Sequence, residues 1–530
     1  MKKYILIGCL SFLGAQQSQT IVFDHSGQFG FQIENGGIRW NQDWRSNGLL
    51  FDGVWAVYPR QLGRKIESGI GEIRNTNPNF DSSQVTSYFT YDMGDYSLDR
   101  FSTGTLYTGQ GRQIHLHGFK RSYGGHYNQY ANRTHQPIQQ FYLSTYASKK
   151  ESEYASLSVG HGNMLSGFPD TTGSGRLSNR FISANVFWQK SLSQLDVQFS
   201  LDQFLQRYET THSMSVFSGV RYLTRSRNAL DIFWNSFQFN LSLNNRQTRM
   251  GKLIEQRWTN FGLKGSSRGF DGNLGWVIAE SESDYFYQFN YEKNFGSLNG
   301  EIEFTKNVDP VHPFYLSQYN QGQNSLLTQI SQKRIGLNWV GEKNSIQLSY
   351  SEMEDHHFWR NTLPDSIPNY LTISKMASIN LGVQTSMIPF VTLEAKYTNQ
   401  TKGTLYGGGI PYFLNYSAHS DFYLFDEFMR VELFLEMNHY FKRIQNGLLN
   451  PIEMVPSGYY SDEKMDDVSL LTGRIRTHVS TFTIQYEWIN IMEMILASMG
   501  SDANKFYEIY PGMPPIGRQV NLSVEWHFLD

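Results

Sequence analysis

The sequence predicts an all-β protein, a large transmembrane antiparallel β-barrel of about 22 strands, within a range of about 20 to 26. Three observations support this. Apolar and polar residues alternate in segments of about ten residues separated by turns, as in membrane-spanning barrel strands. No run of 18 apolar residues occurs in the chain, so no transmembrane helix is expected. Aromatic residues make up 15% of the 530 residues, as expected where aromatic girdles border a lipid-facing band.

The clearest predicted strand is the last one, residues 520–530, which read VNLSVEWHFLD. Every second residue from Val520 to Phe528 is apolar, and the residues between them are polar. Successive side chains of a strand point to opposite faces, so one face is apolar and the other polar. The same pattern recurs at 482–488, 391–398, 378–384, 346–350 and 195–202.

Loop lengths provide a second test, because outer-membrane barrels have short periplasmic turns and longer outer loops. Long and short connections alternate over the last five predicted hairpins. The stretches expected outside the cell are 491–519, 442–467, 401–417, 354–375 and 307–333. The turns expected in the periplasm are 477–480, 426–429, 386–389, 341–344 and 294–297. Earlier strands are expected near 272–280, 257–266, 229–242, 214–223, 195–205, 180–190, 153–160, 138–147, 112–120, 96–106 and 84–92.

The chain divides into three predicted parts. Residues 1–15 form a secretory signal peptide, with Lys2 and Lys3 before an apolar stretch; a lipoprotein signal cleaved just before Cys9 is the alternative. Residues 16–83 form either extra strands, at 28–34, 37–42 and 49–58, or a short periplasmic or lumenal segment. Residues 84–530 form the barrel. Cleavage after Ala15 removes the one cysteine, which excludes disulfides and cysteine metal sites.

Several classes of function are not expected. The net charge is −3 and no basic patch stands out, so nucleic acid is not an expected partner. No nucleophile lies at an informative spacing from a general base, so the protein is not expected to be an enzyme. No cofactor or metal site is expected. His115 and His117 share one strand face and Asp355, His356 and His357 are adjacent, but lumen-lining and solvated-loop roles are the preferred interpretations.

The candidate functional residues are charged side chains on the polar faces of the later strands. They are Glu394, Lys396, Arg430, Glu432, Glu436, Arg474, Arg476, Glu487 and Glu525. Acidic side chains in a pore favour cations. The alternative is that acidic and basic side chains pair across strands and stabilise the wall. The sequence leaves both open.

The last 60 or so residues resemble the end of the TonB-dependent outer-membrane receptors. They read LLTGRIRTHVSTFTIQYEWIN and then YPGMPPIGRQVNLSVEWHFLD. The stretch Tyr510 to Arg518 is similar to the Pro-Gly-Pro-Gly-Arg-like end of the last outer loop in that family, and Phe528 lies where the barrel assembly signal is found. Thr20 to Val22 faintly resembles a TonB box. The family carries a plug domain before its barrel, whereas only about 68 residues separate the predicted signal peptide from the first clear strand. The resemblance therefore implies a plugless, porin-like relative.

The expected location is the outer membrane of a Gram-negative bacterium. The expected function is a porin-like channel or transporter for small solutes. The alternatives are a receptor-type barrel that works with a separate plug or coupler, and a barrel for surface anchoring or adhesion. The expected partners are outer-membrane lipid, the barrel assembly machinery and a small solute, and the resemblance adds a TonB-like coupler.

Overall fold

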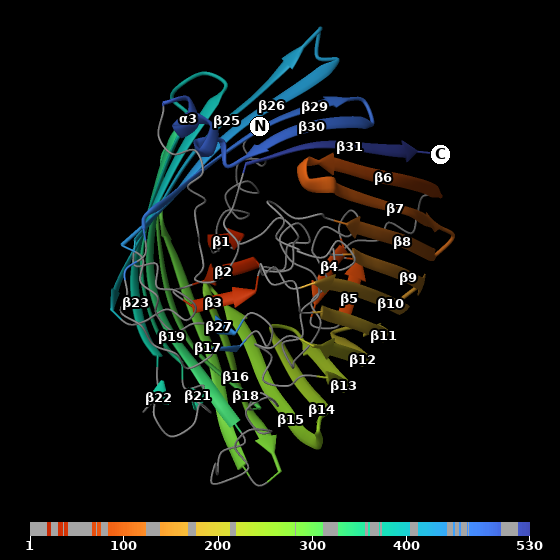
Figure 1. Cartoon of the computed structure of the whole chain (residues 1–530). Helices are drawn as coiled ribbons and strands as arrows, with labels where there is room; N and C mark the ends of the chain where they lie inside the picture. The colour runs from red at the N-terminus through yellow and green to blue at the C-terminus, as the bar shows by residue number, and fades with distance from the viewer. Residues whose placement is uncertain are drawn as a thin grey trace.

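In the computed structural model, 22 antiparallel strands form one closed barrel, in which the last barrel strand, β31, pairs with the first, β6 (Figure 1). Each strand pairs with the next strand of the barrel along the chain. The structure describes residues 19–22, 30–34, 37–40, 66–69, 72–75, 83–122, 138–167, 176–211, 219–280, 282–310, 327–355, 359–360, 370–371, 374–402, 412–442, 449–450, 455–456, 464, 466–499 and 518–529.

The barrel strands are 8 to 17 residues long. They are β6 (Gln84–Gly94), β7 (Leu98–Gly109), β8 (Arg112–Ser122), β9 (Ile138–Lys150), β10 (Glu153–Gly167), β11 (Arg176–Leu192), β12 (Leu195–Thr210), β13 (Gly219–Trp234), β14 (Phe237–Met250), β15 (Lys252–Ser267), β16 (Phe270–Ala279), β17 (Glu282–Phe295), β18 (Leu298–Pro310), β19 (Leu327–Val340), β20 (Asn344–Asp355), β23 (Ser374–Thr385), β24 (Val391–Lys402), β25 (Tyr412–Leu424), β26 (Met429–Phe441), β29 (Val468–Val479), β30 (Phe482–Ile489) and β31 (Gln519–Leu529).

The remaining elements are short. Before the barrel, β1 (Gln19–Val22), β2 (Gly30–Glu34) and β3 (Gly37–Trp40) form one sheet, and β4 (Ile66–Gly69) pairs with β5 (Glu72–Asn75). Two connections between barrel strands each contain a pair of two-residue strands. In one, β21 (Trp359–Arg360) pairs with β22 (Tyr370–Leu371), and in the other, β27 (Leu449–Asn450) pairs with β28 (Val455–Pro456). Within the described ranges, the helical elements are η1 (Asp95–Ser97) and α3 (Ile491–Ser498). Among the described residues, no helix is long and apolar enough to cross a membrane.

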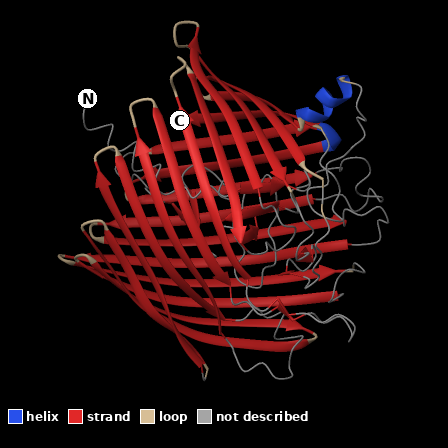
Figure 2. Ribbon diagram, turned by 90° about the vertical axis from the view of Figure 1, so that its left-hand side faces the viewer, coloured by secondary structure: helices blue, strands red, loops and turns tan. Residues whose placement is uncertain are grey.

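The predicted fold is confirmed, with 22 strands in the closed ring. The predicted short turns of the last five hairpins all lie at one end of the barrel, the short-turn rim, and the long connections at the other, the long-loop rim. In Figure 2 the short turns, in tan, follow one rim, and α3, in blue, lies at the opposite one. The short-turn rim is the periplasmic end by the rule for outer-membrane barrels.

One predicted strand was wrong. Residues 229–242 were expected to be a single strand, but they contain the turn Asn235–Ser236 between β13 and β14. Apolar residues stand on both sides of this turn, at Trp234 and Phe237, and it contains neither Gly nor Pro. Asn235 supplies the left-handed conformation with φ 52°, which Asn adopts more readily than most residues.

Some expectations fall outside the described residues. These include the signal peptide at 1–15, the strand expected at 49–58, His356 and His357, and residues 510–517. The strands expected at 28–34 and 37–42 correspond to β2 and β3, which belong to a sheet separate from the barrel. Extra hairpins therefore do not raise the number of barrel strands to 24 or 26.

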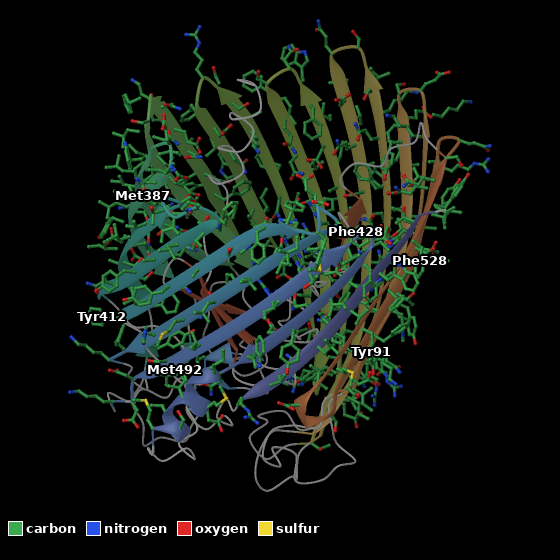
Figure 3. The ribbon with its side chains drawn as sticks, turned by 90° about the horizontal axis from the view of Figure 1, so that it is seen from above. Tyr91, Met387, Tyr412, Phe428, Met492 and Phe528 are labelled. Carbon is green, nitrogen blue, oxygen red and sulfur yellow. The ribbon has the colours of Figure 1, made fainter. Side chains whose placement is uncertain are left out.

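The two faces of the wall differ as the alternation predicted. On β14, Leu241 and Leu243 are 43% and 52% exposed, whereas Ser242 between them is 2% exposed. Tyr91 on β6 and Phe528 on β31 project from the outer side of the wall (Figure 3). Apolar residues on the outside suit a lipid bilayer, and polar residues on the inside suit a lumen. An apolar cluster on the inner face, built around Trp258 and Val277, is an exception.

Candidate functional site

The candidate site is the inner face of the barrel wall, and one ionic group on it is centred on Arg430. The Arg430 guanidinium contacts Asp421 Oδ2 at 2.5 Å and Glu432 Oε1 at 2.8 Å. Glu432 also contacts Arg476 at 3.9 Å and His478 Nε2 at 3.3 Å. Strand register explains the grouping, because Glu432 lies opposite Asp421 on β25 and opposite Arg476 on β29. The Glu432 carboxylate therefore has basic neighbours on its own strand and on β29.

Two more of the predicted carboxylates have partners within the wall. Glu394 contacts Lys396 Nζ at 2.6 Å on the same face of β24. Glu436 Oε1 accepts a hydrogen bond of 2.7 Å from the side-chain amide of Asn415. These contacts hold the side chains against the wall, in line with the wall-stabilising alternative.

The last three predicted residues lie on β29, β30 and β31. The Arg474 guanidinium stacks over the Phe434 ring at 4.7 Å, and Glu487 stands opposite Arg474 in the strand register. Glu525 contacts His527 Nε2. The structure brings together Arg430, Glu432 and Arg476, whereas Glu394 and Glu525 lie at opposite ends of the section from β24 to β31. Sequence reasoning missed Asp421 and His478, which complete the Arg430 group.

A second charged group on the inner face was not predicted. We call it the arginine group: Arg221 and Arg225 on β13 and Arg246 on β14. Arg221 and Arg246 are each 2% exposed. The Arg225 and Arg246 guanidinium carbons lie 5.3 and 5.5 Å from the ring centre of Trp258 on β15.

Strand register forces these like charges together. Arg225 and Arg246 are directly opposite each other in the β13–β14 pairing, where like charges repel. The Trp258 ring offsets part of this cost through cation–π attraction, and Arg246 Nε donates a 2.8 Å hydrogen bond to Gln256 Oε1. Arg221 stacks similarly on Tyr208, at 4.6 Å.

The sequence did contain the pattern for this group. In the stretch VRYLTRSRNA, the positions of Arg221, Arg225 and Arg227 differ from one another by an even number of residues. Side chains at such spacings share one face of a strand. Arg227 lies 4.0 Å from Asp202, whose carboxylate lies on the same face of the neighbouring strand β12. The predicted strand at 214–223 stopped before Arg225, which is why the group was missed.

The two charged groups lie on opposite sides of the lumen. In the closed ring of 22 strands, β26 is eleven strands from β13 in either direction, and β29 is eleven strands from β14. Along the barrel axis they are separated. Arg430 and Glu432 lie near the short-turn end of β26, which begins at Met429, whereas Arg221 and Arg225 lie toward the long-loop end of β13, which begins at Gly219.

A buried row of rings crosses the closing seam of the barrel. His527 on β31, Tyr88 on β6, Gly104 on β7 and His117 on β8 occupy successive opposite positions. The Tyr88 hydroxyl lies 2.8 Å from His117 Nδ1 and 3.3 Å from Nε2 of His115. Gly104 lets the Tyr88 ring pass, because a Cβ there would lie 2.4 Å from the Tyr88 oxygen. In the described part of the chain, no group of three or more His, Cys, Asp or Glu side chains is placed to hold a metal ion.

Comparisons with solved structures place this fold among outer-membrane receptors. The ferric preacinetobactin receptor BauA of Acinetobacter baumannii matches with a TM-score of 0.66 and 11% identity, over 98% of this chain and 93% of that chain. The FrpB iron transporter of Neisseria meningitidis (F3-3 variant) matches with a TM-score of 0.67 and 10% identity, over 97% and 95%. A mutant of the ferric enterobactin receptor PfeA of Pseudomonas aeruginosa, solved in complex with enterobactin, matches with a TM-score of 0.62 and 7% identity, over 85% and 82%.

The sequence comparisons are negative: neither the protein-family models nor the curated proteins match the chain. The structural likenesses, at 7 to 11% identity, establish the fold. A closed barrel with an apolar outer band satisfies every backbone hydrogen bond in lipid, and barrels of this design belong to the bacterial outer membrane. The chain is an outer-membrane β-barrel of the architecture seen in TonB-dependent receptors.

Proposed function

We propose that this barrel is a transporter that passes small anionic solutes through its lumen. The strand number supports a transport role, because barrels of 16 or more strands enclose a channel or a plugged lumen. The structural neighbours are described as an iron transporter and as receptors for ferric preacinetobactin and ferric enterobactin. The single observation that carries the proposal is the arginine group on the inner wall.

The arginine group gives its section of wall a positive field. Charged walls of one sign concentrate ions of the other sign in a pore. The three arginine side chains are only 2 to 7% exposed, so they act on a solute through this field and not by direct contact. A cation preference would depend on five carboxylates. Glu394, Glu432, Glu436 and Glu525 each have a polar or basic partner in the wall, and Glu487 stands opposite Arg474 in the strand register.

The proposal also covers how the solute passes through the barrel. We assign porin-like passage to the lumen. Coupling to a TonB-like protein is the second candidate, favoured by the likeness to TonB-dependent receptors. Pull-down of a TonB-like protein by the full chain, lost on deletion of residues 16–40, would favour coupling over passive passage.

The test of charge preference is a reversal-potential measurement across a salt gradient in a planar bilayer. The wild-type barrel is expected to prefer anions, and Arg225→Gln with Arg246→Gln is expected to reduce that preference. Arg257→Gln is the matched control, because Arg257 is on β15, its side chain is 72% exposed, and it pairs with Glu255. Salt screens such fields over about 8 Å at physiological strength, so the preference should fall as salt rises. A cation preference, or equal effects of the control and the double variant, would refute the proposal.

A further inference from the structure

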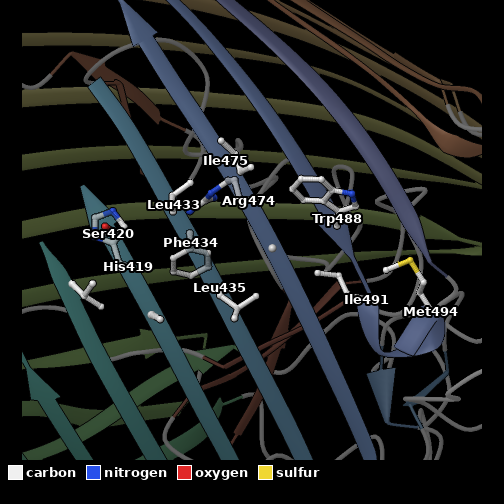
Figure 4. Close-up of a pocket in the computed structure, with 13 residues that line it drawn as sticks. His419, Ser420, Leu433, Phe434, Leu435, Arg474, Ile475, Trp488, Ile491 and Met494 are labelled. Atoms are coloured by element: carbon white, nitrogen blue, oxygen red, sulfur yellow. The ribbon is translucent and has the colours of Figure 1, made fainter. Parts of the chain in front are cut away.

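The outer side of the wall carries an apolar groove of about 600 Å³ between β24, β25, β26, β29, β30 and α3 (Figure 4). Leu433, Leu435 and Ile475 line it and belong to the exposed, lipid-facing positions of β26 and β29. Trp488, Ile491 and Met494 border one side. The lining also includes residues that alternate with these outward-facing positions along β25, β26 and β29, namely His419, Phe434 and Arg474.

Small residues create the hollow. Ala418 on β25 and Gly473 on β29 lie on either side of Leu435, in one row of opposite positions across three strands. Ser420 lies opposite Leu433 in the next row of the same face. Large apolar residues occupy most lipid-facing positions of this barrel, so three small ones in two neighbouring rows lower the surface locally.

Helix α3 forms the raised side of the groove. Strand β30 has 8 residues and ends at Ile489, which is shorter than the roughly 9–11 residues that cross a bilayer. The chain continues as α3, which lies outside the ring of strands (Figure 1). Ile491 packs so closely over Gly473 that a Cβ at Gly473 would lie 3.1 Å from Ile491 Cδ1.

We propose that this groove binds one acyl chain of a membrane lipid. It is continuous with the lipid-facing surface, because Leu433, Leu435 and Ile475 belong to the same apolar outer face, so hydrocarbon is the medium that contacts it. Its volume lies within the roughly 300–1,000 Å³ of sites that enclose small molecules. The ridge of α3 gives the site a concave shape that fits a single narrow chain and prevents the flat wall of a second barrel from reaching the floor.

The test is photolabelling of the full chain in vesicles of phosphatidylethanolamine and phosphatidylglycerol that contain a phosphatidylethanolamine with a diazirine in one acyl chain. Mass spectrometry then locates the labelled residues. Labelling at Leu435, Ile475 and Met494 is expected to exceed several-fold the labelling at Leu337 and Leu348, which are similarly exposed on β19 and β20.

A substitution that fills the groove distinguishes an acyl chain bound in the groove from ordinary contact with membrane lipid. Ala418→Phe is expected to reduce labelling in the groove several-fold, whereas Val383→Phe, at a lipid-facing position of β23, is expected to leave it unchanged. If the Ala418→Phe variant fails to assemble, Ser420→Leu is used to fill the groove instead. Uniform labelling around the barrel, or groove labelling that neither substitution reduces, would overturn the proposal. So would cross-links between two copies of the chain through Leu435, which would assign the groove to a barrel–barrel contact.

Discussion

The row of rings at the closing seam makes a quantitative prediction about stability. Tyr88→Phe keeps the ring in place but removes the hydroxyl that lies 2.8 Å from His117 and 3.3 Å from His115. Tyr88, His115 and His117 are all buried, at 5 to 7% exposed. Leaving a buried polar partner unsatisfied costs about 1–3 kcal/mol. We therefore expect Tyr88→Phe to lower the free energy of unfolding by about 1–3 kcal/mol.

The assay is reversible unfolding in urea from lipid vesicles, followed by the heat-modified mobility of the barrel on gels. With an unchanged slope, the midpoint falls by the loss of free energy divided by that slope. Tyr91→Phe is the matched control, because Tyr91 is on the same strand but faces outward at 38% exposed. A loss from Tyr91→Phe as large as that from Tyr88→Phe would refute the reasoning.

Three further predictions test the wall, the topology and the ionic group. Leu348→Arg, on the outward face well inside β20, is expected to lower barrel stability by about 2–4 kcal/mol, read from heat-modified gel mobility, while Gln347→Arg on the opposite face of β20 is expected to be far milder; equal defects would reverse the assigned faces. A cysteine at Asn450 is expected to react with an impermeant maleimide on whole cells, and one at Asn344 on the short-turn rim is not; the opposite labelling would invert the barrel. Glu432→Gln is expected to lower stability, because it weakens contacts with two arginines, and to leave the reversal potential nearly unchanged; a large shift in that potential would contradict the wall-stabilising role.

The wall was predictable because it depends on local alternation. For example, the two-residue period of side-chain direction in a strand is enough to assign Leu522 and Trp526 to one face and Ser523 and Glu525 to the other. Lengths of connections then give the hairpins, since short turns gather at one rim. Both arguments use residues close in sequence, which is why they extend through most of the chain.

Contacts that cross strands were harder to predict, because they need an exact register. The pairing of Arg225 with Arg246 depends on the turn Asn235–Ser236. With residues 229–242 taken as one strand, these two arginines have no reason to be opposite. The contact of Tyr88 with His527 is harder still, since it arises only when the ring of 22 strands closes.

The distance over which the arginine group acts leads to a last prediction, about residues 16–83. The field of these arginines falls off over about 8 Å at physiological salt, so a solute near the far wall of a wide lumen would not be selected by charge. Anion preference therefore requires that the open path be narrow and close to β13 and β14. If residues 16–83 narrow the lumen, deleting them while keeping residues 1–15 should raise the single-channel conductance and lower the anion preference together. The control is Arg225→Gln with Arg246→Gln in the full chain, which should lower the preference with little change in conductance. An unchanged conductance after the deletion would show that residues 16–83 do not restrict the path and would contradict this prediction.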